Sequence, residues 1–585
     1  QYLTEEEKKQ VDAFVEQIQL EDSTSILQYG AGTQKKMSDF SEKKKKKVRS
    51  KDLGEIGDLL NGVVVELKGF DEEEEKGIVG FFKKKASKAQ TLKLRYSKAE
   101  GSIDQICEKL EGHQVQLLKD SGKNVLSYKC GPDYIDPMFH KKVLGVPSKN
   151  LDTFFTDEKT TVQLFLDERA DGDFAVLEGV MGLYDGLGGI YEQGSSYHLA
   201  KVTQTPIILV VDAKGMGKSV LALIAGFLQY DTQHLIKGVL LNRMSKGYYD
   251  IIKPLIEKEL SVKVVGYFPE QKDIGLSSRH LGLVMPDELS DIKKQLNETA
   301  DRLKKTIDMD LFMDIAAEAD EIGDSGSADV YNEKNIGNCD QNEFSQNKAI
   351  NTVNIAVAMD EAFCFYYEDN LRLLKKCGAK LQYFSPLHDT SLPEDCDAML
   401  LGGGYPELYA RELSKNVSML NAIKKAFRAG MPTVAECGGF MYLHAYIRNI
   451  CDDTDEQNKA DVQNKADIQN DMNKSKLVGA LDGGCHFKGK LVRFGYIELA
   501  EKHSNFLPPN EKIKAHEFHY YDSTDNGADC IATKPATGRS YDCVISHDNY
   551  WLGFPHLYYP SNPHFAESLV RKAYEYRRNK NGKLL

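Results

Sequence analysis

Short apolar runs alternate with longer amphipathic segments through most of the chain after residue 124. Residues 125–128, 174–177, 206–212 and 238–242 are apolar runs with the length of buried parallel strands. Segments with helical spacing of apolar residues lie between these runs. The alternation predicts an α/β fold in which helices cover a doubly wound parallel sheet.

The first 120 residues have a different pattern. They contain no Pro, are rich in Lys, Glu, Leu and Gln, and place apolar residues three or four apart, as in residues 11–18 and 103–110. This spacing predicts an all-α segment over residues 1–120. The Lys run at residues 43–47 and the Glu run at residues 72–75 indicate solvated helix faces or loops rather than interaction patches.

Two polar stretches divide the remainder of the chain. Residues 319–352 are rich in Asn, Asp, Glu, Gly and Ser and predict a mobile linker. One domain is therefore expected over residues 121–318, and another over residues 353–585, which opens with an apolar run at 353–359. Residues 452–474 contain Gln-Asn-Lys-Ala-Asp twice and predict a disordered surface insert in the second domain.

Composition narrows the function classes. A chain of 585 residues is long enough for about three domains. Its formal net charge of −13 argues against a nucleic-acid binder. No apolar run reaches the roughly 18 residues of a membrane helix, and the N-terminal residues contain no apolar stretch typical of a signal peptide. The 11 cysteines form no Cys-x-x-Cys pair, which predicts reduced thiols in the cytoplasm and no zinc site.

Residues 433–443 contain the most informative chemical pattern in the chain. An apolar run ends at Cys437, two glycines follow, and apolar residues with helical spacing come next. This order predicts a strand, a tight turn and a helix. Unpaired N–H groups at a helix N-terminus favour a thiolate and can hold an oxyanion. Cys437 is therefore a candidate nucleophile for acyl transfer; the alternative is a buried, inert cysteine.

Two other segments offer partners for such a nucleophile. Residues 397–401 predict a strand that leads into a glycine-rich turn beginning at Gly402. The N–H groups of this turn can bind an oxyanion, although an ordinary tight turn needs the same glycines. His556 is far from Cys437 in sequence, as thiol–histidine pairs usually are, and is a candidate base. The alternative for His556 is a structural role.

Together these motifs resemble a known family. The Cys-Gly-Gly turn, with Leu-Gly-Gly-Gly-Tyr-Pro-Glu before it, is similar to class I glutamine amidotransferase domains. Motifs at residues 129–137, 177–186, 278–284 and 360–367 resemble the cobyrinic acid a,c-diamide synthase family, and the likeness extends from about residue 121 to the C-terminus. That family uses ATP and glutamine to amidate two carboxylates of the corrin ring in cobalamin synthesis.

The resemblance implies roles for matched residues of the second domain. Cys437 would attack the carboxamide of glutamine and form a thioester, and His556 would transfer the protons. His516 and His519 match a family motif too, and we consider them weaker candidates than His556. The backbone groups that would form the oxyanion hole belong to Gly402, Gly403 and Gly438.

For the first domain, the resemblance implies a substrate loop that contains Asp133 and Tyr134. Glu178 would contact Mg²⁺ or substrate; the alternative is a helix-capping carboxylate. Lys129 and Arg279 are candidate basic partners for an acidic substrate. The implied cofactors are ATP and Mg²⁺, and the implied partners are glutamine and cobyrinic acid. The order of amidation, the cobalt content of the substrate and the oligomeric state, including a homo-oligomer, stay open.

The first 120 residues resemble another family. Residues 27–36, 51–58 and 112–120 are similar to the N-terminal part of the toxic-anion (tellurite) resistance family, which is helical. The two resemblances meet near residues 120–121. This junction suggests a fusion in which one gene's start replaced another's, either natural or as an artefact.

A phosphate-binding loop is missing where the synthase family has one. No Gly-x-x-x-x-Gly-Lys-Ser/Thr occurs in the 585 residues; the nearest pattern, at residues 213–219, has Asp212 in place of the first glycine. The loop would supply N–H groups, a Lys and a Mg²⁺-binding hydroxyl to the nucleotide. We therefore expect a doubly wound sheet without its first strand and phosphate loop, and impaired ATP use.

Three functions follow from these observations. The first is an amidating ligase of cobalamin synthesis, which the downstream motifs favour. The second is a glutaminase remnant that retains Cys437 and His556 but has lost its ATP site. The third is a helical, non-enzymatic resistance or interaction protein in which residues 1–120 carry the role.

Overall fold

The computed structural model describes Leu118 and residues 122–167, 172–270, 289–319, 322, 352–448 and 474–582. All of them belong to one compact unit, Glu100–Leu585. We call residues 122–319 the upstream region and residues 352–582 the downstream region. The predicted helical segment, the linker, the insert and Arg279 lie almost entirely or entirely outside the described residues, so these predictions are not tested.

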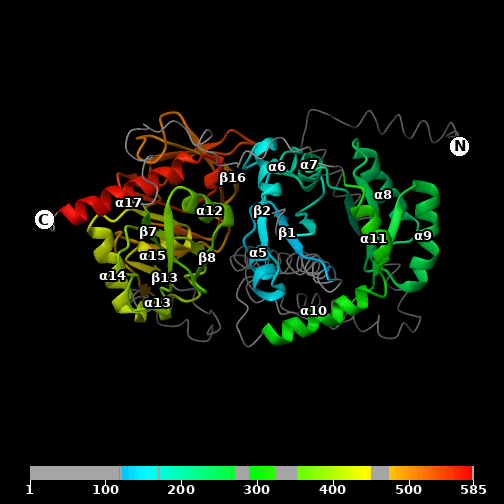
Figure 1. Cartoon of the computed structure of the whole chain (residues 1–585), viewed down its shortest axis with the longest axis horizontal. Helices are drawn as coiled ribbons and strands as arrows, with labels where there is room; N and C mark the ends of the chain where they lie inside the picture. Colours follow the sequence, from blue (N-terminus) through cyan, green and yellow to red (C-terminus); the bar gives the residue numbers. More distant parts are fainter. Residues whose placement is uncertain are drawn as a thin grey trace, which may run out of the picture. The chain divides into compact units, whose positions relative to one another are not determined.

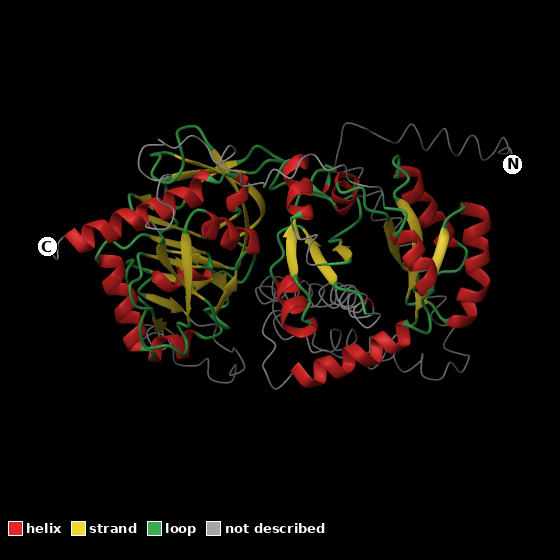
Figure 2. Ribbon diagram, viewed as in Figure 1, coloured by secondary structure: helices red, strands yellow, loops and turns green. Residues whose placement is uncertain are grey.

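The upstream region alternates strands and helices, as its apolar pattern predicts (Figure 1 and Figure 2). Its elements are β1 (Val125–Cys130), α5 (Ile135–Phe139), the π-helix η1 (His140–Leu144), β2 (Ser148–Leu151), α6 (Glu158–Leu166), β3 (Phe174–Glu178), the 3-10 helix η3 (Leu187–Gly189), α7 (Ser196–Val202), β4 (Ile207–Asp212), α8 (Ser219–Tyr230), β5 (Ile236–Asn242), α9 (Lys246–Leu260), β6 (Lys263–Phe268), α10 (Leu289–Leu303) and α11 (Met309–Ala316). All its strand pairs are parallel.

The strands of the upstream region do not form one sheet. They form two three-stranded parallel sheets, in the orders β2-β1-β3 and β4-β5-β6. Among the described strands, β3 pairs with β1 alone and β4 with β5 alone, so each is an edge. Every residue of β1 is buried, whereas four of the five residues of β3 are half-buried and Val210 of β4 is 38% exposed. The expected single sheet is thus divided between β3 and β4.

The downstream region is built on a continuous six-stranded sheet of order β21-β22-β12-β10-β7-β9. Its elements are β7 (Val353–Ala358), β8 (Phe363–Phe365), α12 (Glu368–Lys376), β9 (Ala379–Phe384), β10 (Ala398–Leu401), β11 (Gly403–Gly404), α13 (Ala410–Lys415), α14 (Val417–Arg428), β12 (Thr433–Glu436), α15 (Gly438–Leu443), β13 (Tyr446–Arg448), β14 (Lys474–Lys476), β15 (Gly484–Phe487), β16 (Arg493–Glu501), β17 (Lys512–His519), β18 (Tyr521–Ser523), β19 (Cys530–Thr533), β20 (Ser540–Cys543), β21 (Ile545–His547), β22 (Tyr550–Gly553), β23 (His556–Leu557), the 3-10 helix η4 (Tyr559–Ser561) and α17 (His564–Gly582).

The apolar pattern alone did not predict two further sheets in the downstream region. An antiparallel sheet has the order β20-β19-β16-β17-β23, and a mixed sheet has the order β14-β13-β15-β18. The burial pattern of β17 shows why the prediction failed: Ala515, His516 and Glu517 are buried in succession, whereas Lys512 and Phe518 are exposed, so the strand lacks an apolar run. These sheets carry His516, His519 and His556.

Aromatic side chains join the upstream and downstream regions. Phe155 stacks on Tyr558 with ring centroids 4.8 Å apart, and Tyr134 lies 4.4 Å from Tyr367. The Tyr558 hydroxyl donates a hydrogen bond of 2.8 Å to Asp369. Since these residues are all buried, the contact resembles a domain core and fixes the loop that bears Tyr134 against the downstream region.

Candidate functional site

Cys437 occupies the sharp turn that its sequence predicts. Strand β12 ends at Glu436, helix α15 starts at Gly438, and Cys437 between them has φ 46° and ψ −104°. A positive φ is uncommon for a residue with a side chain and is often retained at functional sites. The Cys437 N–H donates to the Gly553 carbonyl over 2.8 Å, which holds the turn in the central sheet.

The thiol of Cys437 is held in its protonated form. Burial raises the pKa of the thiol well above its usual value, and the negative charge of Glu407 raises it further. A hydrogen bond from the Gly438 N–H opposes these effects without cancelling them. This differs from the expected thiolate, because α15 has just six residues and burial outweighs its N-terminal N–H groups. The thiol therefore needs a base.

The glycine-rich turn packs between the thiol and His556. A Cβ atom on Gly403 would lie 2.4 Å from His556 Cε1, and one on Gly438 would lie 3.0 Å from the Gly404 N. Both positions therefore require a glycine for this approach. The structure thus brings together three segments that are widely separated in the sequence: the glycine-rich turn, the turn at Cys437 and the strand that begins with His556. The Gly402 N–H itself donates to the Tyr366 hydroxyl over 2.8 Å.

His556 is buried and neutral. It begins β23, is paired across the sheet with His516 on β17, and is 3% exposed. Burial, with a contribution from His519, lowers the pKa of His556 to about 3. Its Nδ1 has no hydrogen-bond partner among the described residues. A neutral imidazole with a free lone pair can accept a proton, which fits the predicted role of a base.

The other two predicted histidines adjoin His556 but are held differently. Burial lowers the pKa of His516 to about 3, and its ring lies edge-on to Phe494 at 5.7 Å. His519 stacks on Phe554 with centroids 4.0 Å apart. Its Nδ1 lies 2.7 Å from the backbone oxygen of Tyr521, so Nδ1 carries the proton.

Sequence reasoning missed two acids beside Cys437, of which Glu436 is buried and Glu407 is half-buried. Burial raises the pKa of Glu436 to about 8, and the Tyr559 hydroxyl lies 3.5 Å from its Oε1. Burial raises the pKa of Glu407 to about 7. Their positions were the available signals, since Glu436 directly precedes Cys437 and Glu407 ends the glycine-rich motif.

In the upstream region, the predicted residues Lys129 and Glu178 form a buried ion cluster. Lys129 Nζ lies 2.6 Å from Glu178 Oε1 and 2.5 Å from Asp136 Oδ2. His140 Nε2 lies 3.4 Å from Glu178 Oε2, and burial lowers the pKa of His140 to about 4. Sequence reasoning did not identify Asp136 or His140.

Asp133 and Tyr134 lie between the ion cluster and His556. The Asp133 carboxylate accepts the Ile135 N–H over 2.8 Å, and burial, together with the charge of Asp136, raises its pKa to about 7. The ring of Tyr134 lies 5.2 Å from that of His556. One short loop therefore contacts both clusters.

The carboxylate oxygens of the ion cluster are donor atoms of the type that binds Mg²⁺. No group of three or more His, Cys, Asp or Glu side chains in the described part of the chain forms a metal site. However, Mg²⁺ is commonly held by one or two carboxylates plus substrate phosphates. Glu178 and Asp136 provide such oxygens, and the Lys129 ammonium shows that they accept a cation.

The turn at residues 213–219 joins β4 to α8 but does not resemble a phosphate cradle. Lys218 Nζ lies 3.0 Å from Glu259 Oε1, and Asp212 binds Arg243. Cβ atoms on Gly215 or Gly217 would meet no atom within 4 Å. Gly215 has φ +67°, a backbone conformation that favours glycine, whereas nothing approaches Gly217 closely enough to require one.

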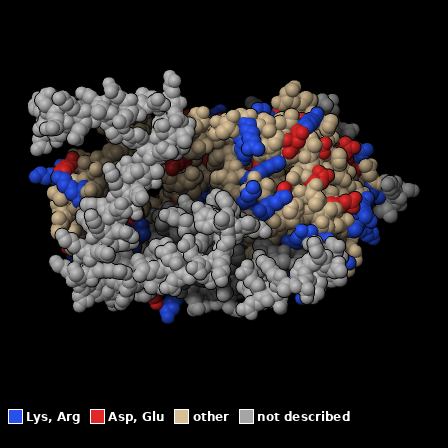
Figure 3. Space-filling model, turned by 180° about the vertical axis from the view of Figure 1, so that it is seen from behind, with Lys and Arg blue, Asp and Glu red and all other residues tan. Residues whose placement is uncertain are grey.

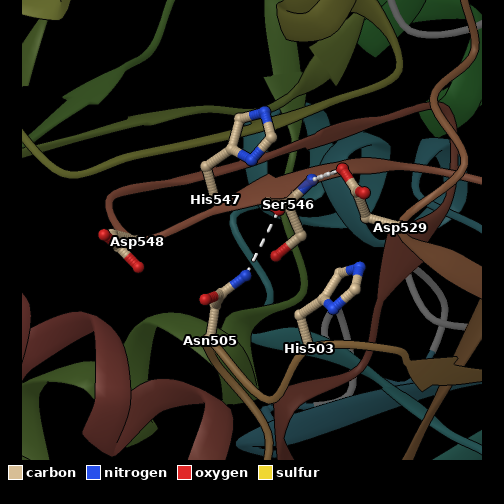
Figure 4. Close-up of a pocket in the computed structure, with 6 residues that line it drawn as sticks. All are labelled: His503, Asn505, Asp529, Ser546, His547 and Asp548. Carbon is tan, nitrogen blue, oxygen red and sulfur yellow. Dashed lines mark hydrogen bonds between the residues drawn. The ribbon is translucent and has the colours of Figure 1, made fainter.

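Figure 4 shows a surface cavity of about 480 Å³ whose lining does not include Cys437. His503, His547 and Asp548 line it, and in its wall the Asn505 side chain donates to the Ser546 carbonyl over 3.2 Å. None of the predicted site residues lines this cavity.

Comparisons with known proteins place the chain in a family. Residues 354–562 match the CobB/CobQ-like glutamine amidotransferase domain. The chain is 37% identical over 438 residues to a cobyrinate a,c-diamide synthase of Caldanaerobacter subterraneus subsp. tengcongensis, which covers 74% of this chain and 88% of the relative. It is 35% identical over 464 residues to that of Clostridium tetani, which covers 78% and 95%. The chain belongs to the cobyrinate a,c-diamide synthase family. It is a glutamine-dependent amidotransferase of the ligase type.

This family member has a second match. Residues 11–123 match the toxic anion resistance protein (TelA) family, which confirms the resemblance of the first 120 residues. No helix among the described residues is long and apolar enough to cross a membrane. Basic and acidic side chains are interspersed on the described surface seen in Figure 3.

Proposed function

We propose that the chain amidates the a and c carboxylates of cobyrinic acid, with glutamine as the nitrogen donor and ATP as the activating substrate. The observation that carries this proposal is that the residues around Cys437 and the ion cluster around Glu178 are linked by one loop. Cys437, the glycine-rich turn and His556 adjoin one another, and Tyr134 links them to the ion cluster around Glu178. The names of the relatives support the choice of substrate.

In the first half-reaction, His556 takes the thiol proton as Cys437 attacks the carboxamide carbon of glutamine. N–H groups at Gly403 and Gly438 hold the developing oxyanion. The C–N bond breaks, and His556 returns the proton to the departing ammonia. Water then hydrolyses the thioester and releases glutamate. The high pKa of the thiol and the neutral state of His556 support this order of proton transfers.

In the second half-reaction, ammonia passes the Tyr134 loop and reaches a corrin carboxylate that ATP has phosphorylated. Ammonia attacks the acyl phosphate, the C–O bond to phosphate breaks, and an amide forms. Mg²⁺, when bound, would neutralise phosphate charge and would be held by Glu178 and Asp136. Lys129 would then be released to pair with an acidic substrate, which its present contacts with both carboxylates support.

We further propose that the second half-reaction is slow in this chain. The 585 residues contain no phosphate-binding loop pattern. The unpaired edges of β3 and β4 are where a strand leading into such a loop would fit in a parallel sheet, with the loop at its carboxyl end. Without the N–H groups, the Lys and the hydroxyl of a phosphate-binding loop, the nucleotide would be bound weakly, and ATP-dependent amidation would be slow.

Incubation of the purified full chain with cobyrinic acid, Mg-ATP and glutamine, followed by mass spectrometry, tests the proposal. Glutamate and ADP are measured in the same samples. We expect glutamate formation in excess of amide formation, with a diamide as the final product. Ammonium chloride in place of glutamine tests the second half-reaction alone.

The products separate the remaining candidates. A diamide formed at the rate of glutamate release would overturn the proposed impairment. Glutamate without any amide, with glutamine or ammonium chloride, would favour the glutaminase remnant, for which the divided upstream sheet is the supporting observation. If neither glutamate nor amide forms, the result would contradict both the ligase and the glutaminase remnant.

A further inference from the structure

Glu407 is a carboxylate beside the candidate nucleophile, and it forms no ion pair with a Lys, Arg or His of the described residues. It follows the glycine-rich turn, and the Pro406 ring would lie 2.9 Å from a Cβ atom on Gly438. Its negative charge acts on the thiol of Cys437 and on the phenol of Tyr521. Burial raises the pKa of Glu407, and its own backbone N–H is the one group that opposes this rise. Such a carboxylate is stabilised by a ligand that brings a positive charge.

The second observation is an unsatisfied hydroxyl on Tyr521, which packs in the same buried apolar cluster as Cys437. Tyr521, on β18, is 5% exposed, and its Oη has no hydrogen-bond partner among the described residues. Leaving a buried hydroxyl unpaired is costly, so it indicates a partner that is brought by a ligand. The phenol pKa is raised by burial and by Glu407, which keeps this oxygen neutral and able to accept an N–H.

A third polar atom in the same neighbourhood is an acceptor. His519 shares a hydrogen bond with the Tyr521 backbone and acts electrostatically on His556. Because His519 Nδ1 donates to the Tyr521 carbonyl, its Nε2 carries a lone pair, and this buried atom also has no partner in the described structure. Carboxylate, phenol and imidazole thus all offer acceptors.

We propose that Glu407 and Tyr521, with His519 beside them, bind the α-ammonium group of glutamine. An ammonium has three N–H donors and a positive charge, and it matches this set of acceptors better than a carboxylate does. The inference rests on the proposed glutaminase step and names the groups that recognise its substrate. Fixing the amino-acid end of glutamine directs its carboxamide to Cys437.

The test compares glutamine with 4-carbamoylbutanoate, which has the same carboxamide and carboxylate but a hydrogen in place of the amino group. We expect wild-type chain to prefer glutamine by about 10- to 100-fold in kcat/KM for ammonia release, the usual value of a charge-assisted contact. Glu407→Gln should lose most of that preference by raising KM for glutamine and leaving KM for the analogue unchanged. Tyr521→Phe should lose a smaller part.

The ratio of the two substrates separates recognition from other effects of the substitution. Removing the Glu407 charge also lowers the pKa of the Cys437 thiol, but this changes both substrates alike and cancels in the ratio. Glu412→Gln is the matched control. Glu412 is exposed on helix α13, and its substitution removes the same charge. An unchanged preference in Glu407→Gln would overturn the inference.

A binding measurement keeps this inference distinct from the proposed reaction. Calorimetric titration of Cys437→Ser with glutamine and with the analogue requires no turnover. If wild-type chain releases no ammonia, the proposed half-reaction fails, while tighter binding of glutamine that Glu407→Gln abolishes would still support the ammonium site. Equal binding of both compounds to Cys437→Ser would overturn it.

Discussion

Two buried clusters of ionisable groups lie on either side of Tyr134, and they differ in how their charges are balanced. In the upstream cluster, Lys129 is paired with Glu178 and Asp136 at 2.5–2.6 Å. In the downstream cluster, the thiol of Cys437 and the ring of His556 are both neutral, because burial moves their pKa values in opposite directions. Paired charges stabilise a resting structure, whereas neutral partners are ready for proton transfer.

The sheets that carry the two clusters also differ: one is continuous and the other is divided. The downstream sheet continues through six strands, with β12, which leads into Cys437, in its interior. The upstream strands form two sheets of three, and the division falls next to β3, which ends at Glu178. The comparison indicates that the candidate nucleophile rests on a continuous sheet, whereas the proposed nucleotide chemistry rests on a divided one.

The largest expected effect separates the two clusters directly. Cys437→Ala should reduce glutamine-dependent ammonia release by at least about 1,000-fold, because it removes the thiol that is proposed to form the thioester. Ammonium-dependent amidation should not change. Rates of glutamate and amide formation measure both. Cys377→Ala, which alters a half-buried cysteine at the end of α12, is the control, and an equal loss there would contradict the assignment.

The next effect is on stability and concerns the upstream cluster. Lys129→Met should lower the free energy of unfolding by about 3–5 kcal/mol, since it leaves two buried carboxylates without their cation. Urea unfolding measures the change. Lys246→Met removes an exposed pair with Asp250 and should cost less than about 1 kcal/mol. Similar costs for the two variants would show that the buried charges are balanced in another way.

A smaller effect concerns the buried acid Glu436 and appears as a pH dependence of stability. The folded-state pKa of Glu436 is raised by burial to about 8, above its ordinary 4.5. The stability that its neutral form contributes is complete below pH 4.5 and is lost as the pH rises to about 8. Glu436→Gln cannot ionise, so between pH 5 and pH 8 it should lose about 3.5 kcal/mol less than wild type.

Unfolding curves at pH 5 and pH 8 measure this difference, with Glu412→Gln as the exposed control. Parallel stability curves for wild type and Glu436→Gln would show that Glu436 is ionised in the folded chain. This result would remove the contrast between a neutral downstream cluster and a charged upstream one.

The smallest effect concerns glutamine binding. Because the pKa of Glu407 is about 7, its carboxylate is present above that pH and is protonated below it. The neighbouring Cys437 thiol and Tyr521 phenol have raised pKa values and stay neutral through this range. KM for glutamine should therefore rise about tenfold from pH 8 to pH 6, and KM for 4-carbamoylbutanoate should not. A parallel rise for both compounds would assign the titration to another group.

Local patterns predicted the nucleophile turn and most parallel strands correctly. The apolar run, the cysteine and the two glycines around Cys437 correspond to β12, the turn and α15, because each element depends on neighbours in sequence. The same holds for β7 and β10, whose apolar runs are fully or nearly fully buried. The antiparallel sheets were missed, since a strand such as β17 mixes polar and apolar residues at its buried positions.

By itself, the sequence determined the α/β class, the family resemblance and the candidate pair of Cys437 and His556, since these depend on local spacing and on recognisable motifs. The tertiary structure decided the rest. Gly403 contacts His556, Tyr134 reaches across to it, and Glu407 acts on the thiol through space. Burial then sets each protonation state, and burial depends on every segment that packs around the site, which no short stretch of sequence contains.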